Sequence, residues 1–561
     1  MTDQPAPAPD PKRAKLFTVK SVAMTALGFA AGLPFAAVGG TLYAWFTAAK
    51  VDVSTIGVLS WAGLAYGFKF LWSPLLDRYA APLIGRYGFR RGWMLFFQAV
   101  IVGCLAFIAG SDPGANLAGI ALASVVASFA SASQDVVIDA WRIEVADDEA
   151  PVDILSAAYQ MGFRASSLLA GAGALIFASK AGWPFTYWAI AALMAVAMLG
   201  AVFAPPSPAQ PSPTRGPSPE DDWLPAAKRN RLIVPVMAGW AASAAGLFGF
   251  MAYAVLSDGA ANSIAFTRTY GPLIVLACVG GPGLAAALSL RWRTMEATAA
   301  EKAIRWPLQG LLDAFYAAVI SPMADLVGRL RWGALLVLVL VLSYRFTDAV
   351  WGAFAYPFYL GDPADGLGAL GHTNDEVAVA SKMFGVVMTI AGIAGGGVAL
   401  VKLGRPICLI AGAVIAAATN LLLADLAVGG PRVDAALSVT GVYPVFAAMT
   451  PFFQGLGLDA EINEAMTQLM AVIAMENLAL GFASAVFVAY LSAIVNPRYA
   501  AVQYALLASL TLLIGALGRG ALGQLIKTEG YAYVFVMTAI IGLFAVAVSI
   551  AEVIRTRRAT A

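Results

Sequence analysis

The stretch APPSPAQPSPTRGPSPEDDW, residues 204–223, separates two long parts of the chain. It is rich in proline and serine, whereas long apolar runs lie on both sides of it. Segments of this composition are typical of extended linkers. We therefore expect the chain to divide here.

The runs on both sides of this linker are too apolar for a soluble domain. Of the 561 residues, 60% are hydrophobic and 12% are charged, and the mean hydropathy is +0.77. A helix of about 20 apolar residues crosses a hydrocarbon core of roughly 30 Å, and runs of this length recur along the chain. Strand-length alternation, typical of an outer-membrane barrel, is absent from the sequence. The sequence therefore predicts an all-α integral membrane protein.

Fourteen apolar runs have the length of a membrane span. Six precede the linker, two follow it, and six more come after an amphipathic stretch. The predicted spans are 21–49, 54–76, 93–110, 116–142, 154–179, 183–204, 231–257, 270–290, 332–358, 376–399, 404–427, 466–494, 499–526 and 531–555. A long outer loop with room for a short helix is expected at 428–465.

These spans predict two six-helix halves with two extra transmembrane helices between them, a layout that resembles the major facilitator superfamily. The extra helices carry little charge, so we expect them to have a packing role. The predicted parts are a tail at 1–20, a half at 21–204, a linker at 205–230, the extra helices at 231–290, an amphipathic connection at 291–331, a half at 332–555 and a tail at 556–561.

Basic residues indicate the orientation in the membrane. Lysine and arginine gather in the N-terminal tail, at the C-terminus and in the connections at 77–92, 143–153 and 291–331. The opposite loops hold few of them. The positive-inside rule therefore predicts that both termini are cytoplasmic. No cleavage site follows a short apolar core near the N-terminus, so we expect a retained tail and not a signal peptide.

Nine of the charged residues within the predicted spans need an explanation. An ionisable side chain near the bilayer centre costs about 3 kcal/mol on insertion scales, so each should face a partner or a wet cavity. Opposite signs occur in both halves, so the charges either pair to hold helices together or line a solvated path; for the whole set we favour the path. They are Lys69, Asp135, Asp139, Arg164, Arg345, Asp348, Lys382, Glu476 and Arg519.

Two carboxylates end the fourth span, in SASQDVVIDAW at 131–141. Asp135 and Asp139 share one helix face because they are four residues apart. Arg142 follows at the predicted cytoplasmic boundary, so Asp139 is expected to pair with Arg142 or with a basic loop residue. Asp135 lies one turn deeper. Burial raises the pKa of a carboxyl group, and a nearby cation lowers it again. We therefore expect Asp135 to gain a proton at one stage of a cycle and lose it at another.

The second half repeats this mixture of charge and aromatic rings. Arg345 and Asp348 are three residues apart on one face, and Trp351 follows in the same predicted helix. Glu476 and Asn477 stand near the middle of a later span, before small residues that allow close helix approach. Rings beside carboxylates and amides suit a sugar, although each ring by itself is also an ordinary membrane aromatic.

The connection after the second span reads FKFLWSPLLDRYAAPLIGRYGFRRGWM, residues 68–94. It resembles the loop motif of the major facilitator superfamily, in which glycine, Asp-Arg and a later basic pair lock the inner gate. Asp77 and Arg78 match that motif, whereas Ser73 replaces its glycine and the basic pair Arg90–Arg91 comes later. The resemblance implies a gate at this connection.

Five segments together resemble the AmpG family of anhydromuropeptide permeases. They are GFAAGLPFAAVGGTLYAW (28–45), YGFKFLWSPLLDRY (66–79), SASQDVVIDAW (131–141), MENLALGFASAVFVAYL (475–491) and VQYALLASL (502–510). Familiar members carry their two extra helices after the second half, whereas here the pair falls between the halves. The role of those helices is therefore not carried over from the family.

The resemblance implies import of N-acetylglucosaminyl-1,6-anhydro-N-acetylmuramic acid, with or without its stem peptide, across the bacterial inner membrane. It implies dependence on the proton gradient, a role in peptidoglycan recycling, and an effect on β-lactamase induction where that system exists. Matching motif positions assigns the family's polar positions to this chain. They are Lys69, Asp77, Ser133, Gln134, Asp135, Asp139, Glu476, Asn477 and Gln503.

We expect Asp135, Glu476 and Asp348 to carry protons. The expected substrate-binding residues are Lys69, Gln134, Arg164, Arg345, Asn477, Gln503, Tyr43, Trp45, Tyr66 and Trp351. The expected gate residues are Asp77, Arg78, Asp139 and Arg142. We expect a monomer. Its expected partners are the substrate, protons and the lipid bilayer, and we expect it to bind no nucleic acid.

Other functions fit parts of the same pattern. A major facilitator protein for a peptide, an acyl-nucleotide or a drug is the nearest alternative, and a sensor without flux is another. An enzyme acting on lipid-linked sugars is disfavoured, because the only histidine, His372, lies in a predicted outer loop and no phosphate-binding loop is evident. Cys104, Cys278 and Cys408 lie far apart in apolar runs, so we expect neither a disulfide nor a metal or other cofactor.

Overall fold

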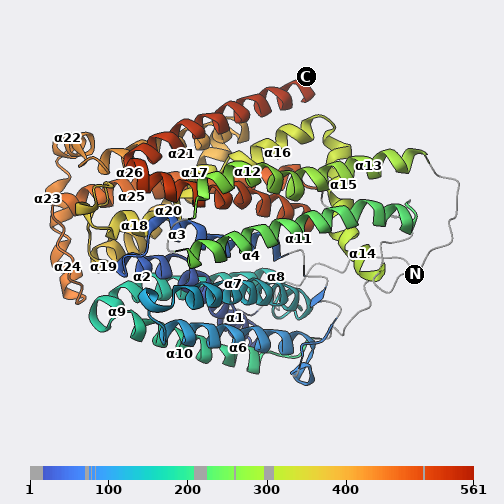
Figure 1. The fold of residues 1–561 in the computed structure, drawn as a ribbon, viewed down its shortest axis with the longest axis horizontal. Coiled ribbons are helices and arrows are strands. Elements are labelled where there is room, and N and C mark those ends of the chain that lie inside the picture. The colour runs from blue at the N-terminus through green and yellow to red at the C-terminus, as the bar shows by residue number, and fades with distance from the viewer. Residues whose placement is uncertain are drawn as a thin grey trace. The chain divides into compact units, whose positions relative to one another are not determined.

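A computed structural model of the protein describes residues 15, 17–69, 72, 75–76, 79–82, 84–207, 224–257, 261–295, 309–496 and 500–560. Every regular element in these residues is a helix (Figure 1). The chain forms two compact units. The first comprises Met1–Thr41 and Leu71–Thr214, and the second comprises Leu42–Phe70 and Arg215–Ala561. The first predicted span is thus divided between the units, after Thr41.

The first unit contains five long helical segments, some interrupted by a wide helical turn. Its elements are α1 (Val19–Ala36), η1 (Ala37–Thr41), η4 (Gly85–Tyr87), α6 (Phe89–Ala109), α7 (Pro113–Glu144), α8 (Val152–Leu168), η5 (Leu169–Gly173), α9 (Ala174–Ala181) and α10 (Trp183–Phe203). Local sequence explains several of their ends. Thr18 and Ser21 form a capping box at the start of α1. Asp112 caps α7, whose first residue is proline.

Glycines set the contact between α1 and α8. A Cβ atom added at Gly162 would lie 1.9 Å from the carbonyl oxygen of Thr25, and one at Gly28 would lie 2.2 Å from that of Tyr159. Only glycine permits this approach of two backbones, as at other membrane helix interfaces. The contact fixes the position of Tyr159, which the functional site uses.

The second unit begins with the rest of the first predicted span and the second span. These are α2 (Leu42–Ala48), α3 (Val53–Leu59), η2 (Ser60–Gly63) and α4 (Leu64–Phe68). The helices after the linker follow. They are α11 (Ala226–Leu256), α12 (Ser263–Val275), η6 (Leu276–Gly280), α13 (Gly281–Met295), α14 (Gln309–Phe315), η7 (Tyr316–Ile320) and α15 (Ser321–Leu330).

The remaining helices of the second unit include several short ones. They are α16 (Gly333–Ser343), α17 (Phe346–Trp351), α18 (Ala355–Leu360), η8 (Pro363–Asp365), α19 (Asn374–Val377), η9 (Ala378–Phe384), α20 (Gly385–Leu403), α21 (Arg405–Leu426), α22 (Pro431–Thr440), α23 (Tyr443–Ala447), α24 (Thr450–Gly455), α25 (Glu464–Ile494) and α26 (Ala500–Thr560). The predicted close approach at the small residues after Glu476 is confirmed, since a Cβ at Gly481 would lie 2.2 Å from the Thr389 carbonyl oxygen.

The expected fourteen spans are only partly recovered. Among the described residues, eleven helices are long and apolar enough to cross a membrane, or up to thirteen if each of two sharply bent helix pairs counts as one span. The predicted span at 54–76 is represented by a shorter apolar helix, Val53–Tyr66. The last two predicted spans both lie in α26, and Gly530, where the backbone is non-helical with φ +80°, divides them next to the predicted boundary. The shortening of the second span and the bends in the two helix pairs leave hydropathy unchanged, so the sequence did not predict them.

The two extra helical spans pack within the second unit. The Ser263 hydroxyl of α12 donates to the carbonyl oxygen of Gly520 in α26, at 2.7 Å. The rings of Phe250 and Phe266 stack with centroids 4.2 Å apart, and Trp61 lies beside both. These contacts are those of packing helices, as the scarcity of charge in this pair predicts.

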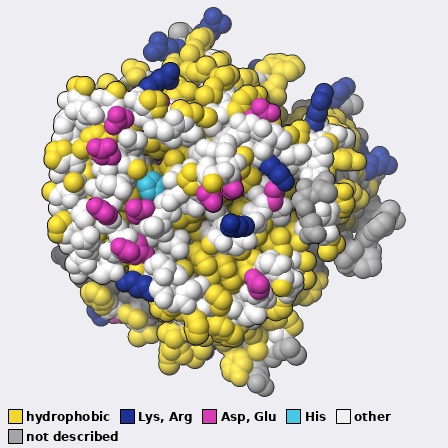
Figure 2. All heavy atoms as spheres, turned by 60° about the vertical axis from the view of Figure 1, so that its left-hand side comes forward, with side chains coloured by type: hydrophobic (Ala, Val, Ile, Leu, Met, Phe, Trp, Pro, Cys, Tyr) yellow, Lys and Arg dark blue, Asp and Glu magenta, His cyan; other side chains and the backbone are white. Residues whose placement is uncertain are grey.

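The predicted outer loop at 428–465 holds three short helices, α22, α23 and α24, rather than one. Figure 2 shows carboxylates scattered over the face that these helices and α19 present. In the connections 361–373 and 456–464, which adjoin these helices, the exposed acidic residues are Asp362, Asp365, Asp459, Glu461 and Glu464. Few basic residues accompany them in these loops, as the orientation rule expects for an outer side.

Candidate functional site

In the first unit, Asp135 and a tyrosine of the neighbouring helix form a hydrogen bond. The hydroxyl of Tyr159 in α8 donates to Oδ1 of Asp135 in α7 at 2.5 Å. Tyr159 is buried, and Asp135 is half-buried. A neutral donor therefore satisfies one oxygen of this acid.

Asp139 differs from Asp135 in both exposure and partner. Its carboxylate pairs with Arg142 one turn later, at 2.9 Å, and its side chain is 41% exposed. The expected boundary pair between Asp139 and Arg142 is therefore confirmed. The Arg142 guanidinium also lies 5.5 Å from the ring centroid of Tyr159. One tyrosine therefore contacts both Asp135 and the cation that pairs with Asp139. The other expected gate residues, Asp77 and Arg78, lie outside the described residues.

Gln134 is held by the backbone of α1. Its Nε2 donates to the carbonyl oxygen of Ala30 at 2.7 Å, and its side chain is fully buried. Proline has no N–H, so Pro34 cannot donate to the carbonyl of Ala30 four residues before it. Gln134 supplies the missing donor. Its neighbour Ser133 accepts a hydrogen bond from Nε1 of Trp72 at 2.9 Å.

Arg164 is on the same helix as Tyr159, but its side chain is exposed. The structure therefore does not bury this predicted substrate-binding cation beside Asp135. Lys69, at the end of α4 in the second unit, is half-buried.

In the second unit, Arg345 and Asp348 stand where a predicted span breaks. Arg345 precedes α17, and its Nε lies 3.3 Å from Oδ2 of Asp348 in the first turn. The predicted placement on neighbouring positions of one face is thus confirmed. Helix α16 ends at Ser343, so the pair lies at the start of the short helix α17, with Arg345 as its N-cap and Asp348 in its first turn, rather than in the middle of a long helix.

Glu476 and Asn477 lie on α25, facing the helix that carries Thr389. Asn477 donates to Glu476 Oε2 at 3.2 Å and accepts from the Thr389 hydroxyl at 2.9 Å. The charges of Asp348 and Lys382 both act on Glu476. The structure therefore brings two of the expected proton carriers, Asp348 and Glu476, into one electrostatic group.

Lys382 and Arg519 extend this group toward aromatic rings. The ammonium of Lys382 lies 5.2 Å from the ring centroid of Tyr356. Nη2 of Arg519 would be 3.7 Å from a Cβ placed at Gly352, and its charge acts on the Tyr43 hydroxyl. Tyr43 lies on α2, which packs against α18.

The other predicted sugar-contacting rings are mostly packed. Trp45 and Trp351 are buried, and Tyr66 is half-buried. The ring of Trp351 lies 4.3 Å from that of Phe535, centroid to centroid. For Trp351, this contact is that of an ordinary packing aromatic.

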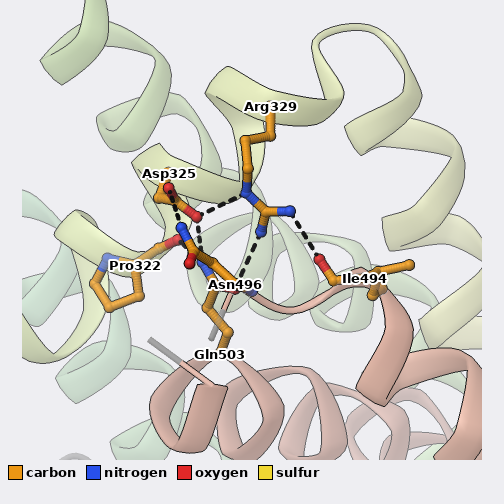
Figure 3. A network of polar contacts seen from close by, with 6 residues as sticks. All are labelled: Pro322, Asp325, Arg329, Ile494, Asn496 and Gln503. Atoms are coloured by element: carbon orange, nitrogen blue, oxygen red, sulfur yellow. Dashed lines mark hydrogen bonds and ion pairs between the residues drawn. The ribbon is translucent and has the colours of Figure 1, made fainter. Parts of the chain in front are cut away.

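Gln503 lies in a different place from the other predicted substrate-binding residues. It is 1% exposed at the start of α26 and forms hydrogen bonds with α15 and with the connection from α25 (Figure 3). Its surroundings are those of a helix junction.

One ion pair on the predicted outer side joins the ends of two helices. Nζ of Lys527 in α26 lies 2.6 Å from the carboxylate of Asp52, which caps α3. Burial would raise the pKa of Asp52, but hydrogen bonds from Lys527 and Ser54 outweigh it and hold the pKa below its usual value. On the opposite side, a hydrogen bond from Lys20 lowers the pKa of Asp147.

Sequence reasoning missed Tyr159 and did not assign roles to Lys382, Arg519 and Tyr356. Lys382 and Arg519 were visible as charges within apolar runs, and that signal could have added them to the site. Nothing in the local sequence marks Tyr159, because its role depends on α8 lying against α7 and α1.

The charged side chains of the second-unit group share one property. Arg345, Asp348, Lys382, Glu476 and Arg519 are each half-buried. Ionisable side chains in apolar surroundings need a partner or a wet cavity.

No family model matches the chain. One segment is 42% identical over 192 residues to the anhydromuropeptide permease of Escherichia coli (strain K12), covering 33% of this chain and 37% of that permease. The putative transporter AmpG 4 of Rickettsia felis is 24% identical over 519 residues, covering 92% of each chain. The chain is related to the AmpG permeases. Its match to the Escherichia coli permease spans little more than a third of the length of that protein.

Solved structures of other proteins show which fold the chain has. The POT family transporter PepTSo matches with a TM-score of 0.60 at 12% identity, over 97% of this chain and 99% of its own. A mutant of the nucleoside transporter NupG matches with a TM-score of 0.56 at 11% identity, over 95% of this chain and 100% of its own. This AmpG relative therefore has the fold of the major facilitator superfamily. Its relatives and structural neighbours are transporters and not enzymes.

Proposed function

We propose that this protein imports anhydromuropeptides from the periplasm to the cytoplasm across the bacterial inner membrane. The substrate is N-acetylglucosaminyl-1,6-anhydro-N-acetylmuramic acid with or without its stem peptide. Both termini lie in the cytoplasm, and the protein works by proton-coupled alternating access in peptidoglycan recycling. The relation to the Escherichia coli permease supports the substrate, and the major facilitator fold supports the mode of transport.

The observation that carries the proposal is the half-buried group of charges in the second unit. A muramyl group and a stem peptide both present carboxylates, and sugars present hydroxyls. Arg345 and Lys382 supply cations, and Asn477 supplies an amide beside Glu476. Opposite charges attract strongly in a medium of low dielectric constant, which favours such a substrate over a neutral one.

Proton coupling is assigned to Asp135, Glu476 and Asp348. In the first unit, the hydrogen bond from Tyr159 aligns the carboxyl group of Asp135. In the second unit, Asp348 and Lys382 act on Glu476, so a proton gained by one acid changes the balance of charge around the other. Binding of an anionic substrate near Arg345 or Lys382 alters the same balance, which couples solute to proton.

The roles of the remaining residues follow from this assignment. Lys69, Arg164 and Arg345 attract substrate carboxylates. Gln134, Asn477 and Gln503 are the polar positions that match the family motif, and Tyr43, Trp45, Tyr66 and Trp351 offer sugar-stacking rings. Asp77, Arg78, Asp139 and Arg142 form the inner gate, and the pair between Asp139 and Arg142 supports their part of it.

Uptake into sealed vesicles tests the proposal. Vesicles holding the purified protein should accumulate labelled anhydro-disaccharide when the outside is acidic, and should only equilibrate it without a proton gradient. Unlabelled anhydro-disaccharide should compete, whereas dipeptides and nucleosides should not. Accumulation that dipeptides abolish would assign the protein to peptide transport, and binding without accumulation would indicate a sensor.

Asp135→Asn tests the proton assignment in the same vesicles. It removes the charge while leaving an oxygen to accept from Tyr159. Gradient-driven uptake should fall, and exchange of labelled for unlabelled substrate should continue. Unchanged gradient-driven uptake would remove Asp135 from the coupling mechanism.

A further inference from the structure

Helix α15 is joined to the connection between α25 and α26 by a network of polar side chains (Figure 3). Asp325 of α15 is its centre. Its carboxylate accepts hydrogen bonds from Nδ2 of Asn496 at 2.9 Å, Nε2 of Gln503 at 2.8 Å and Nε of Arg329 at 2.9 Å. Three donors from three different places therefore converge on one acid.

Gln503 uses both ends of its amide in this network. Nε2 donates to Asp325 and to the carbonyl oxygen of Pro322, the latter at 2.9 Å. Oε1 accepts from the backbone N–H of Asn496 at 2.7 Å and from Nη2 of Arg329 at 3.2 Å. The amide has two donor hydrogens and two acceptor sites, and all four are engaged. In this conformation the side chain has no polar group left for a solute.

Arg329 extends the network to the end of α25. Its Nη1 donates to the carbonyl oxygen of Ile494, the last residue of that helix, at 3.0 Å. Carbonyls in the last turn of a helix lack a partner within it, and a cation there is favourable. The network therefore holds the end of α25 and the beginning of α26 at once.

The other side of α15 is anchored by apolar contacts. Pro322, Met323, Ala324 and Leu326 are buried, and α15 packs against α13, where Leu290 would lie 3.5 Å from a Cβ at Gly328. Helix α13 belongs to the extra helices. A single short helix thus connects those extra helices with the junction of α25 and α26.

We expect this network to be either intact or broken as a whole. While it is intact, every buried polar group of Gln503 is satisfied. Removal of one partner leaves a buried donor or acceptor unpaired, which costs more than an average hydrogen bond contributes. The network is therefore expected to form and break as a unit.

We propose that α15 is a latch that couples the extra helices to the junction of α25 and α26, with Asp325 and Gln503 as its positioning residues. The latch holds the junction in the present conformation and opens when the helix ends on this side rearrange. The extra helices thereby influence transport without touching the solute. The cross-linking test below rests on the proposed substrate, whereas the hydrogen-exchange test does not, so failure of the proposed function and failure of the latch can be told apart.

Hydrogen exchange of the full-length protein in nanodiscs tests the anchoring step. Asp325→Asn puts an amide in place of the carboxylate, so it can no longer receive three donors. Amide exchange in 321–330 and 500–510 should become about tenfold faster, as expected for the loss of one hydrogen bond to a charged group. The matched control is Asp313→Asn, in the same connection as Asp325, which removes an ion pair with Arg229 of α11 at 2.9 Å. If Asp325→Asn left exchange in both segments unchanged, or if Asp313→Asn accelerated 500–510 equally, the latch would be refuted.

Reversible cross-linking tests the opening step. Asp325→Cys and Asn496→Cys are combined in a chain whose Cys104, Cys278 and Cys408 are replaced by serine, and the pair is joined by a short reducible thiol cross-linker. Uptake of labelled anhydro-disaccharide should fall at least about tenfold on linking and return on reduction. Each single cysteine variant treated with the same reagent should be unaffected. Linked protein that transports as fast as reduced protein would overturn the proposal, and recovery on reduction excludes misfolding as the cause of a loss.

Discussion

The charged groups of the two units use similar residues in different ways. In the first unit, Asp135 receives a neutral hydroxyl from Tyr159, and the nearby cation Arg142 pairs with the shallower Asp139. In the second unit, two acids and two cations act on one another around Glu476 and Asp348. In the second arrangement, charges of both signs therefore act on the same carboxylates.

The two groups also differ in whether the helix that carries them is continuous. Asp135 lies inside the continuous part of α7, beside the tight contact of α1 with α8. Arg345 and Asp348 lie at a break between α16 and α17. Broken helices are common where transporters bind solutes and ions, because the freed backbone and mobile ends can rearrange. We infer that the first group holds its geometry and that the second responds to the solute.

Gly162→Ala should have the largest effect, because it disrupts the tight contact of α1 with α8 beside the first group. The new Cβ would meet the Thr25 carbonyl oxygen at 1.9 Å, so α1 and α8 must separate. Overpacking of this kind costs about 1–3 kcal/mol, which should lower folded yield and the melting temperature, measured by size-exclusion chromatography and thermal unfolding. Gly173→Ala, whose nearest contact is a leucine side chain at 3.8 Å, is the control and should be tolerated. Equal behaviour of the two variants would show that this contact is not tight in the protein.

Glu476→Gln tests the responsive group. The amide keeps the size of the side chain and removes the charge on which Asp348 and Lys382 act. Gradient-driven uptake in vesicles should fall by roughly a hundredfold, the lower end of what a positioned proton-transfer group contributes. Substrate exchange without a gradient should fall much less. A loss of equal size in both assays would instead assign Glu476 to substrate binding.

Tyr159→Phe separates alignment from charge in the first group. It removes the hydroxyl that donates to Asp135 and leaves the ring beside Arg142. A hydrogen bond to a charged group contributes about 1.5–3 kcal/mol, so gradient-driven uptake should fall by about tenfold or more, though less than in Asp135→Asn. A Phe variant whose gradient-driven uptake equals that of the wild type would show that the hydroxyl does not influence the acid.

Asp52→Asn should have the smallest effect, because its ion pair with Lys527 is partly exposed. Such pairs contribute about 0.2–1 kcal/mol, so the melting temperature should fall by less than about 2 °C at pH 7. The pKa of Asp52 is lower in the folded protein than in the unfolded chain, so the contribution is present above the ordinary carboxyl range and is lost as pH falls through the folded value. The difference from wild type should therefore persist down to about pH 4 and narrow below it. A difference that grew on acidification would contradict this assignment.

Much of the helical layout followed from hydropathy. The apolar runs correspond to helices, and the pairs Asp139–Arg142 and Arg345–Asp348 lie where helical spacing predicts them. The number of spans did not follow, because the shortening of the second predicted span to Val53–Tyr66 and the sharp bends in two helix pairs do not change composition. The hydrogen bonds of Gln503 were also beyond sequence reasoning, since its partner Asp325 is 178 residues away along the chain.

The sequence by itself determined that this is a helical membrane protein, with charges placed inside its spans at a cost that demands partners. It also carried the resemblance to AmpG, because motif residues are local. Only the tertiary structure decided which partner each charge has. Tyr159 reaches Asp135 because glycines bring α8 against α1, and Gln503 reaches Asp325 because α15 packs beside α13. The physical reason is that the free-energy cost of burying a side chain depends on its residue type, whereas its hydrogen-bond partner depends on which helices pack together.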